Sequence, residues 1–440
     1  MSRTQASKAG LFYFVFVMYS YTTAGPFGLE DQVSTSGPGL TLIYHLVLPF
    51  FWCIPISLVA AELTTAMPVQ GGFYRWTRAA FGDFWGFLAG WWNWTASFLL
   101  GSAYAVLFTD YLSFYFPGIT GWKHYLVSVL LIAVIAGVNI RGIRAVGKVA
   151  TVLEILVLIP IVALCAISLQ KWQHNPFHPL VPPHGPTFQV FGVGLALGLW
   201  LYSGYEQLST VAEEVEEPQR NFPRALAWVV PISIATYFLP TFCSLGAAGN
   251  WQQWHTGYFS QAAQAIGGRW LGFSMTVAAT ITNICLLNST VLSSTRMPFA
   301  MADDGYMSPV LARLHSRFGT PWVAIVSSSV VYALLAWHSL TQLISVYIWL
   351  RIATSLMTVL SAWQLRRSAP EMERTFRIPW GGKGLLYAVG APVLMSGVAL
   401  LGSDRFGLHW GPVALLLGPL FYLFFRRKTS ADSAEAGTPS

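Results

Sequence analysis

Two apolar segments of the sequence are interrupted by small residues that lie next to carboxylic acids. In the first, residues 25–28 read Gly-Pro-Phe-Gly and are followed by Glu30 and Asp31. In the second, the pair Ser203-Gly204 is followed by Glu206. Because glycine and proline weaken helical hydrogen bonding, both segments are predicted to be broken helices.

A helix that is broken inside a membrane can bind a solute. Its half-helix ends leave N–H groups and carbonyls unpaired near the bilayer midplane, where they can hold the polar ends of a substrate. An ordinary kinked helix is the alternative, because glycine and proline are common in membrane spans. Two breaks at matching places, one beside an intramembrane carboxyl group, favour a transport site.

The residue types around the breaks favour a positively charged solute. Pro26 removes an N–H donor that a carboxylate would use, whereas Glu30, Asp31 and Glu206 would attract an amine. Aromatic rings nearby can pack against methylene groups and attract a cation. The alternative for Glu30 and Asp31 is a hydrated position at the external mouth. The predicted substrate-binding residues are Gly25, Pro26, Phe27, Gly28, Glu30, Trp200, Tyr202, Ser203, Gly204, Tyr205 and Glu206.

Glu206 is also the candidate for coupling transport to an ion. A carboxyl group within a membrane is costly unless it is paired, hydrated or protonated, so it can serve as a proton carrier. The alternative is a neutral carboxyl group that is hydrogen-bonded to nearby carbonyls. Glu154, which faces the predicted helix bundle, is a second coupling candidate. We expect no cofactor and no metal site, and protons, or else Na⁺, as the coupling ion.

The predicted binding and coupling residues can act inside a membrane only if the rest of the chain forms membrane-spanning segments. The chain is 54% hydrophobic and only 10% charged, whereas a soluble domain carries about 25% charged residues. Its apolar runs approach the ~20 residues with which a helix crosses the hydrocarbon. We predict an all-α integral membrane protein with twelve transmembrane helices, centred on residues 11–29, 41–61, 84–112, 125–139, 149–170, 190–212, 226–248, 271–292, 321–337, 340–363, 384–402 and 409–425.

Basic residues indicate the orientation. With the N-terminus inside, most of the 25 lysines and arginines fall in cytoplasmic loops, as the positive-inside rule requires. Both termini are therefore predicted to be cytoplasmic, in a multi-pass protein of the plasma (inner) membrane. The formal charge of +7 is an orientation signal and does not indicate nucleic-acid binding. The sequence leaves the oligomeric state open.

The two broken spans are the first and the sixth, which indicates two inverted repeats of five helices each. We predict one transmembrane domain over residues 1–428, with repeats at about 10–170 and 188–363 and two further helices within 384–425. The polar tail at 429–440 is predicted to be disordered.

Several motifs resemble the amino acid–polyamine–organocation (APC) superfamily of transporters. They are Ala61-Glu62-Leu63, Gly71-Gly72-Phe73-Tyr74-Arg75-Trp76, Gly90-Trp91-Trp92-Asn93-Trp94, Gly204-Tyr205-Glu206 and the acidic run from Glu213 to Glu217. Within the superfamily, residues 25–31 and Arg377-Ile378-Pro379 look most like the proton-coupled polyamine and L-type amino acid transporters. The resemblance implies a LeuT-type fold, with Trp200 as an aromatic gate and Glu206 at a coupling or amine-binding position.

The sequence therefore predicts a secondary active transporter, and not an enzyme, that moves a small amine-bearing solute by alternating access. A polyamine or a cationic amino acid is favoured. A broad-specificity neutral amino acid permease or exchanger is the alternative, and a non-transporting solute sensor is an alternative of another class. The sequence shows no nucleophile–base or metal-ligand pattern that would indicate catalysis.

Overall fold

The computed structural model describes residues 10–23, 25–67, 71–142, 146–183, 187–205 and 216–435. This part of the chain forms helices joined by turns and loops, and it contains no β-strand. Helices are what the long apolar runs predict, because a backbone polar group in lipid must be bonded within its own segment.

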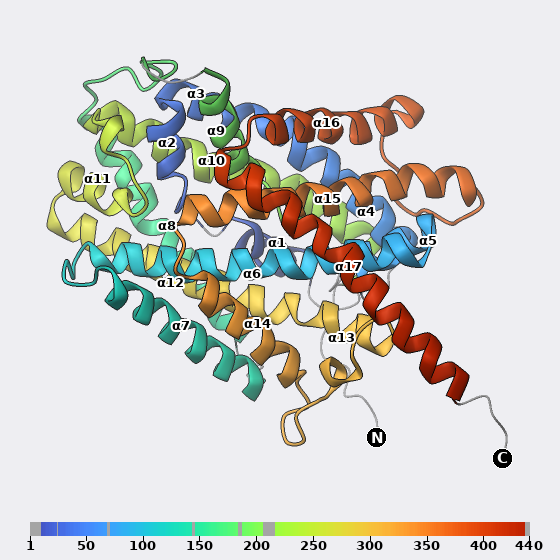
Figure 1. Cartoon of the computed structure of the whole chain (residues 1–440). Coiled ribbons are helices and arrows are strands. Elements are labelled where there is room, and N and C mark those ends of the chain that lie inside the picture. The colour runs from blue at the N-terminus through green and yellow to red at the C-terminus, as the bar shows by residue number, and fades with distance from the viewer. Residues whose placement is uncertain are drawn as a thin grey trace.

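Helices follow one another along the described chain (Figure 1). The first eight are α1 (Leu11–Thr22), α2 (Glu30–Ser36), α3 (Pro38–Leu48), α4 (Ile54–Ala66), α5 (Gly72–Phe81), α6 (Asp83–Ser113), α7 (Trp122–Arg141) and α8 (Val146–Gln170). The others are α9 (Thr187–Leu201), α10 (Pro218–Ala248), α11 (Tyr258–Gly267), α12 (Arg269–Ser294), α13 (Arg296–Asp303), α14 (Trp322–Leu335), α15 (Leu340–Ser368), α16 (Gly381–Leu401) and α17 (Arg405–Glu435). A π-helix, η1 (Pro49–Cys53), joins α3 to α4, and short 3₁₀ helices lie at η3 (Trp251–Gln253) and η4 (Pro309–Ala312).

Seven helical segments of the described residues are long and apolar enough to cross a membrane. They are Pro38–Ala66, Trp122–Arg141, Arg220–Ala248, Arg269–Asp303, Leu340–Ser368, Gly381–Leu401 and Arg405–Phe425. The 31 residues of α6 add a helix about 46 Å long, and α1, α8, α9 and α14 overlap the other predicted spans. The chain is therefore a multi-pass helical membrane protein.

The first predicted span is interrupted at the glycines that the sequence singles out. Helix α1 ends at Thr22, and the chain is helical again only from Glu30, where α2 begins. Between them, Gly25 and Gly28 have φ angles of 138° and 97°. Residues with a side chain rarely adopt such angles, so this interruption depends on glycine.

In the sixth predicted span the helix also ends before the end of the span, and we call the described residues after it the second interruption. Helix α9 ends at Leu201, and the residues after it leave the α-helical pattern, with Gly204 at a φ of 113°. Residues 206–215, the rest of this predicted span and the loop after it, lie outside the described chain.

Two helix pairs share the same pattern of glycines. Helices α5 and α11 have ten residues each and follow left-handed glycines, Gly71 at φ 90° and Gly257 at φ 89°. Each is joined to the next long helix by a further glycine, Gly82 at φ 86° and ψ −178°, and Gly268 at φ 82° and ψ −179°. Figure 1 shows α5 at one end of the bundle and α11 at the opposite end, and we call these the α5 end and the α11 end.

Helix α6 forms the middle of the bundle, where it packs against α5, α7, α12, α14, α15 and α17. The red helix in Figure 1, α17, runs along the outside of the bundle. Its helical pattern continues to Glu435, into the tail for which the sequence predicts disorder. Ala431, Ala434 and Glu435 are good helix formers, which accounts for the extra turns.

Candidate solute-binding site

The interruptions after α1 and α9 are in contact with each other. A Cβ atom at Gly28 would lie 2.8 Å from Cη2 of Trp200, in the last turn of α9. A Cβ atom at Gly204 would lie 3.9 Å from Cγ2 of Thr22, the last residue of α1. The glycine at position 28 thus provides the room that the indole ring occupies. Each interrupted segment contacts the other through one of its glycines.

A cavity lies between the two interrupted segments, and we call it the central cavity. Residues of both segments line it, together with residues of α6, α10, α12 and α15. Its volume is about 60 Å³, well below the roughly 300–1,000 Å³ of ordinary small-molecule pockets. A diamine or an amino acid would fit only after the surrounding helices move apart.

The structure brings five of the predicted binding residues to the central cavity. Gly25 and Phe27 come from the first interruption, and Trp200, Ser203 and Gly204 come from the second. The Phe27 and Trp200 side chains are each only 6% exposed, so their rings form walls that exclude water. The described candidates that do not line the cavity are Pro26, Gly28, Glu30, Tyr202 and Tyr205.

Side chains of helix α10 form hydrogen bonds with both interruptions. The Thr23 hydroxyl lies 2.6 Å from the Ser233 hydroxyl, which ties the end of α1 to α10. One turn further along α10, the Tyr237 hydroxyl donates to the carbonyl of Leu201 at 3.0 Å. This carbonyl belongs to the last residue of α9, where the helix no longer provides a partner. Tyr237 therefore replaces a backbone bond that is lost where α9 ends, and Ser233 binds a side chain where α1 ends.

Glu30 is fully buried, and its carboxylate binds protein groups. The N–H of Gly28 donates to Oε2 at 2.7 Å, and the Tyr111 hydroxyl on α6 donates to Oε1. The sequence predicts that Glu30 contacts the substrate. In the structure its carboxylate binds the glycine turn and anchors it to α6, and Glu30 is not among the residues that line the central cavity.

Asp31 points in a different direction, because successive helical residues are about 100° apart. Its Oδ1 accepts from the Thr256 N–H at 2.8 Å, and its Oδ2 accepts from the hydroxyls of Thr256 and Thr341 at 2.9 and 3.0 Å. Thr256 precedes α11, and Thr341 lies in the first turn of α15. Asp31 therefore ties α2 to two other elements at the α11 end.

The two tyrosines of the second interruption have buried positions. The Tyr202 hydroxyl donates to the carbonyl of His45 at 2.8 Å, so it anchors the end of α9 to α3. Tyr205 is 1% exposed. Ser203 donates to the carbonyl of Leu199 at 2.5 Å and accepts from the Trp52 indole at 3.0 Å. Ser203 is the one of these three that also borders the central cavity.

The two predicted coupling residues are not positioned by the structure. Glu206 lies outside the described residues. Glu154 belongs to α8, whose backbone is described there, but its side chain is not. Their roles therefore remain predictions from the sequence.

The central cavity also has lining residues that sequence reasoning missed. Asn93 and Tyr104 come from α6, and Tyr347 and Arg351 come from α15. Asn93 lies within the tryptophan-rich motif, which marks a helix but not the direction in which each side chain points. Arg351 is a lone charge inside a predicted apolar span, and that is the signal that could have identified it.

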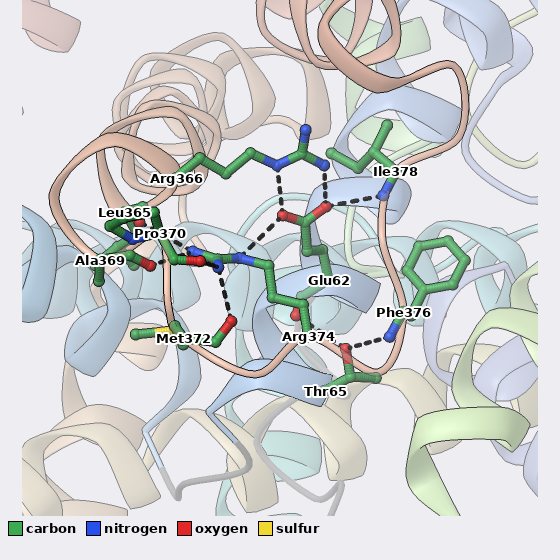
Figure 2. Close-up of polar contacts among 10 residues, drawn as sticks. All are labelled: Glu62, Thr65, Leu365, Arg366, Ala369, Pro370, Met372, Arg374, Phe376 and Ile378. Carbon is green, nitrogen blue, oxygen red and sulfur yellow. Dashed lines mark hydrogen bonds and ion pairs between the residues drawn. The ribbon is translucent and has the colours of Figure 1, made fainter.

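At the α5 end, a buried acid joins three segments of the chain. Figure 2 shows Glu62 of α4 facing Arg366 of α15 and Arg374 of the following loop. Arg366 donates from Nε to Oε1 at 2.7 Å and from Nη2 to Oε2 at 2.5 Å. Nε of Arg374 lies 3.5 Å from Oε1, and the Ile378 N–H donates to Oε2 at 2.8 Å. The Glu62 side chain is 1% exposed, so these contacts are shielded from water.

Arg374 also holds the loop itself in place. Its guanidinium donates to the carbonyls of Met372 at 2.8 Å and Leu365 at 2.9 Å (Figure 2). The end of α15 and the loop before α16 are therefore fixed to α4 by one cluster, which we call the Glu62 cluster: Glu62, Arg366, Arg374 and Ile378.

A more exposed ion pair lies at the same end of the bundle. Nε of Arg78 donates to Oδ1 of Asp83 at 2.7 Å, and the two side chains are 39% and 55% exposed. Hydrogen bonds from Tyr306 and Arg78 hold the pKa of the Asp83 carboxyl below its usual range, so the pair is charged at neutral pH. Because water screens this pair, it contributes little stability compared with the buried cluster.

Known proteins are similar in sequence to this chain over most of its length. Residues 10–404 match the amino acid permease family. A polyamine transporter of Arabidopsis thaliana is 30% identical over 402 residues, which are 90% of this chain and 81% of the relative. A polyamine transporter of Oryza sativa subsp. japonica is 30% identical over 403 residues, 90% of this chain and 74% of the relative. An uncharacterized transporter of Mycobacterium tuberculosis is 29% identical over 398 residues, 86% of each chain.

The match to the permease family includes the described parts of both interruptions, the central cavity and the Glu62 cluster. It agrees with the superfamily resemblance of the motifs, and the polyamine transporters among the relatives agree with the narrower group. The protein is a transporter rather than an enzyme, and it belongs to the amino acid permease family.

Proposed function

We propose that the protein is a secondary active transporter of a small amine-bearing solute, either a polyamine or a cationic amino acid. The contact between the two interrupted helices, which line one cavity, is the observation that carries this proposal. Interrupted helix ends offer backbone N–H groups and carbonyls to a solute at that place. The aromatic walls formed by Phe27 and Trp200 suit a cation with methylene groups. Relatives that are polyamine transporters support an amine as the cargo.

Alternating access is the mechanism that we propose for this transporter. The cavity is small and both ends of the bundle are held by polar contacts, as an occluded state requires. The Asp31 contacts at the α11 end involve uncharged partners, which separate more easily than the buried ions of the Glu62 cluster. Release of Asp31 from Thr256 and Thr341 would therefore open the α11 side first.

We further propose the LeuT-type arrangement, with inverted repeats at about residues 10–170 and 188–363. The matching glycine units at α5 and α11, which lie at opposite ends of the bundle, support this arrangement. Arg75, Arg78, Arg366 and Arg374 gather at the α5 end, and the positive-inside rule assigns that end to the cytoplasm. Both termini would then be cytoplasmic, in the plasma (inner) membrane.

Proton coupling is the last part of the proposal, and Glu206 is its carrier. The support comes from the sequence alone, because this residue follows the second interruption inside an apolar segment. A carboxyl group there is stable when protonated or when paired with a cation, which suits a group that alternates between the two. Na⁺ is the alternative coupling ion.

Uptake by the purified protein in liposomes tests the function. The proteoliposomes receive an inward proton gradient in sodium-free buffer and labelled putrescine, arginine, leucine or glutamate. We expect putrescine and arginine to accumulate well above leucine and glutamate, and only while the gradient persists. Accumulation of leucine or glutamate in preference to both cations would contradict the proposed cargo.

The coupling role is tested separately by Glu206→Gln. We expect this variant to lose the dependence of uptake on the proton gradient, because the amide cannot carry a proton at neutral pH. Glu216→Gln is the matched control, since it makes the same substitution at an exposed position and is expected to behave as the parent. An unchanged rate and pH dependence in Glu206→Gln would exclude this residue as the carrier.

A further inference from the structure

One buried positive charge lines the central cavity. Arg351 lies in the middle of α15, is 2% exposed, and borders the same cavity as Phe27 and Trp200. Among the described residues of the lining it is the one charged side chain. A guanidinium inside a membrane protein is costly to bury, and such residues are rare outside functional pathways.

A guanidinium suits a carboxylate better than any other side chain does. Its five N–H donors are arranged as a fork that matches the two oxygens of a carboxylate. Because it has five donors, Arg351 can keep contacts with the protein and still present donors to a solute. Lysine would keep the charge but lose the two-point geometry.

The first interruption provides fewer donors for a carboxylate than a usual half-helix end does. Pro26 has no N–H, and the N–H of Gly28 donates to Glu30 at 2.7 Å. Interrupted helices of transporters commonly hold an anionic substrate group with such N–H donors. In this protein, the group best suited to binding a substrate carboxylate is therefore Arg351 on α15.

We propose that Arg351 binds a carboxylate of the transported solute, so that the preferred cargo is a cationic amino acid rather than a simple polyamine. This inference rests on the proposed function and narrows its cargo. The amine of the same solute would face the Phe27 and Trp200 rings, where a cation is attracted to the aromatic faces. A polyamine, by contrast, would bring a second positive charge into the cavity that Arg351 lines and would gain no ion pair from it.

The test compares solutes that differ only in the carboxylate. The pairs are lysine with cadaverine, ornithine with putrescine and arginine with agmatine, offered to the full-length protein in liposomes. In the parent protein we expect each amino acid to have a KM at least tenfold lower than its decarboxylated counterpart. In Arg351→Met the KM for the amino acids should rise at least tenfold, while uptake of cadaverine and putrescine stays the same or improves. For Arg351→Lys we expect KM values for the amino acids between those of the parent protein and those of Arg351→Met.

The ratio of the two uptake rates within one preparation is the readout, because it does not depend on how much variant protein folds or inserts. Thr354→Val, on the same helix but outside the cavity lining, is the control and should leave the ratio unchanged. Equal losses for both members of each pair in Arg351→Met and Arg351→Lys would overturn the inference and leave the proposed function intact. No uptake of any of the six amines by the parent protein would overturn the proposed function and this inference together.

Discussion

Alanine at position 28 is expected to lower the initial rate of solute uptake by about tenfold or more. The new Cβ would lie 2.8 Å from Cη2 of Trp200, closer than real Cβ contacts come, and 3.2 Å from Cδ1 of Leu107, a tight contact that would require Leu107 to shift slightly. The φ angle of 97° adds strain of about 1–3 kcal/mol for any residue with a side chain. Because Trp200 lines the central cavity, the ring can move away from Gly28 only by changing the shape of the cavity. Uptake into liposomes, normalised to the amount of protein, measures the effect.

Two further variants separate the contact from a general loss of protein. Gly118→Ala is the matched control, because no atom lies within 4 Å of a Cβ there, and it should transport at the parent rate. Trp200→Phe lacks the Cη2 atom, so the double variant Gly28→Ala/Trp200→Phe should recover part of the rate lost in Gly28→Ala. Parent-like uptake by Gly28→Ala would show that the two interruptions do not meet as described.

Removal of the Glu62 charge is expected to have the largest effect on stability. In Glu62→Gln, the guanidinium groups of Arg366 and Arg374 lose their buried counter-charge, while the shape of the side chain is nearly unchanged. Loss of one partner from a buried ion pair costs about 3–5 kcal/mol. Thermal unfolding in detergent should therefore begin at a clearly lower temperature, and uptake should fall because α15 is no longer fixed to α4.

Asp83→Asn is the control for this prediction, because it removes the same charge at the same end of the bundle. Its partner Arg78 is 39% exposed and Asp83 is 55% exposed, so a cost of no more than about 1 kcal/mol is expected. The unfolding temperature of Glu62→Gln should lie clearly below that of Asp83→Asn. Equal decreases in unfolding temperature for the two variants would mean that burial does not strengthen the Glu62 cluster.

For simple physical reasons, the sequence predicts an all-helical membrane protein and the places where α1 and α9 end. Hydrophobic runs of about 20 residues require a helix in lipid. Gly25 and Gly28 mark an interruption because only glycine readily adopts the φ angles that occur there. Such local requirements can be read from neighbouring residues alone.

The direction of each polar side chain depends on contacts between distant segments, and the sequence could not provide it. Glu30 and Asp31 are neighbours of the same type, yet one binds Tyr111 on α6 and the other binds Thr256 and Thr341. The sequence assigned Glu30 to the substrate because an acid beside an interrupted helix suits an amine. Its partner on α6 is 81 residues away in the chain, a separation that no local pattern indicates.

Two features had signals in the sequence that went unused. Gly71 and Gly82 are as far apart as Gly257 and Gly268, and this shared spacing marks the matching units around α5 and α11. Arg351 is the other, since a lone charge within a span of otherwise apolar and neutral residues is a functional candidate by default. The glycines and Arg351 are each costly to replace. Both signals can be recognised from residue types and spacing alone.

Protection of cysteines by the solute tests the central claim most directly, namely that the cargo is held between the two interrupted helices. Thr23→Cys and Ser203→Cys, one on each side of the cavity, are introduced separately into a variant whose four native cysteines are replaced. Each is then labelled with a water-soluble thiol reagent, with and without a saturating transported amine. Thr120→Cys, exposed in the loop after α6, is the control and should be labelled equally in both conditions. We predict that the solute slows labelling of the thiol in both cavity variants; protection in neither variant, or in only one, would contradict the account.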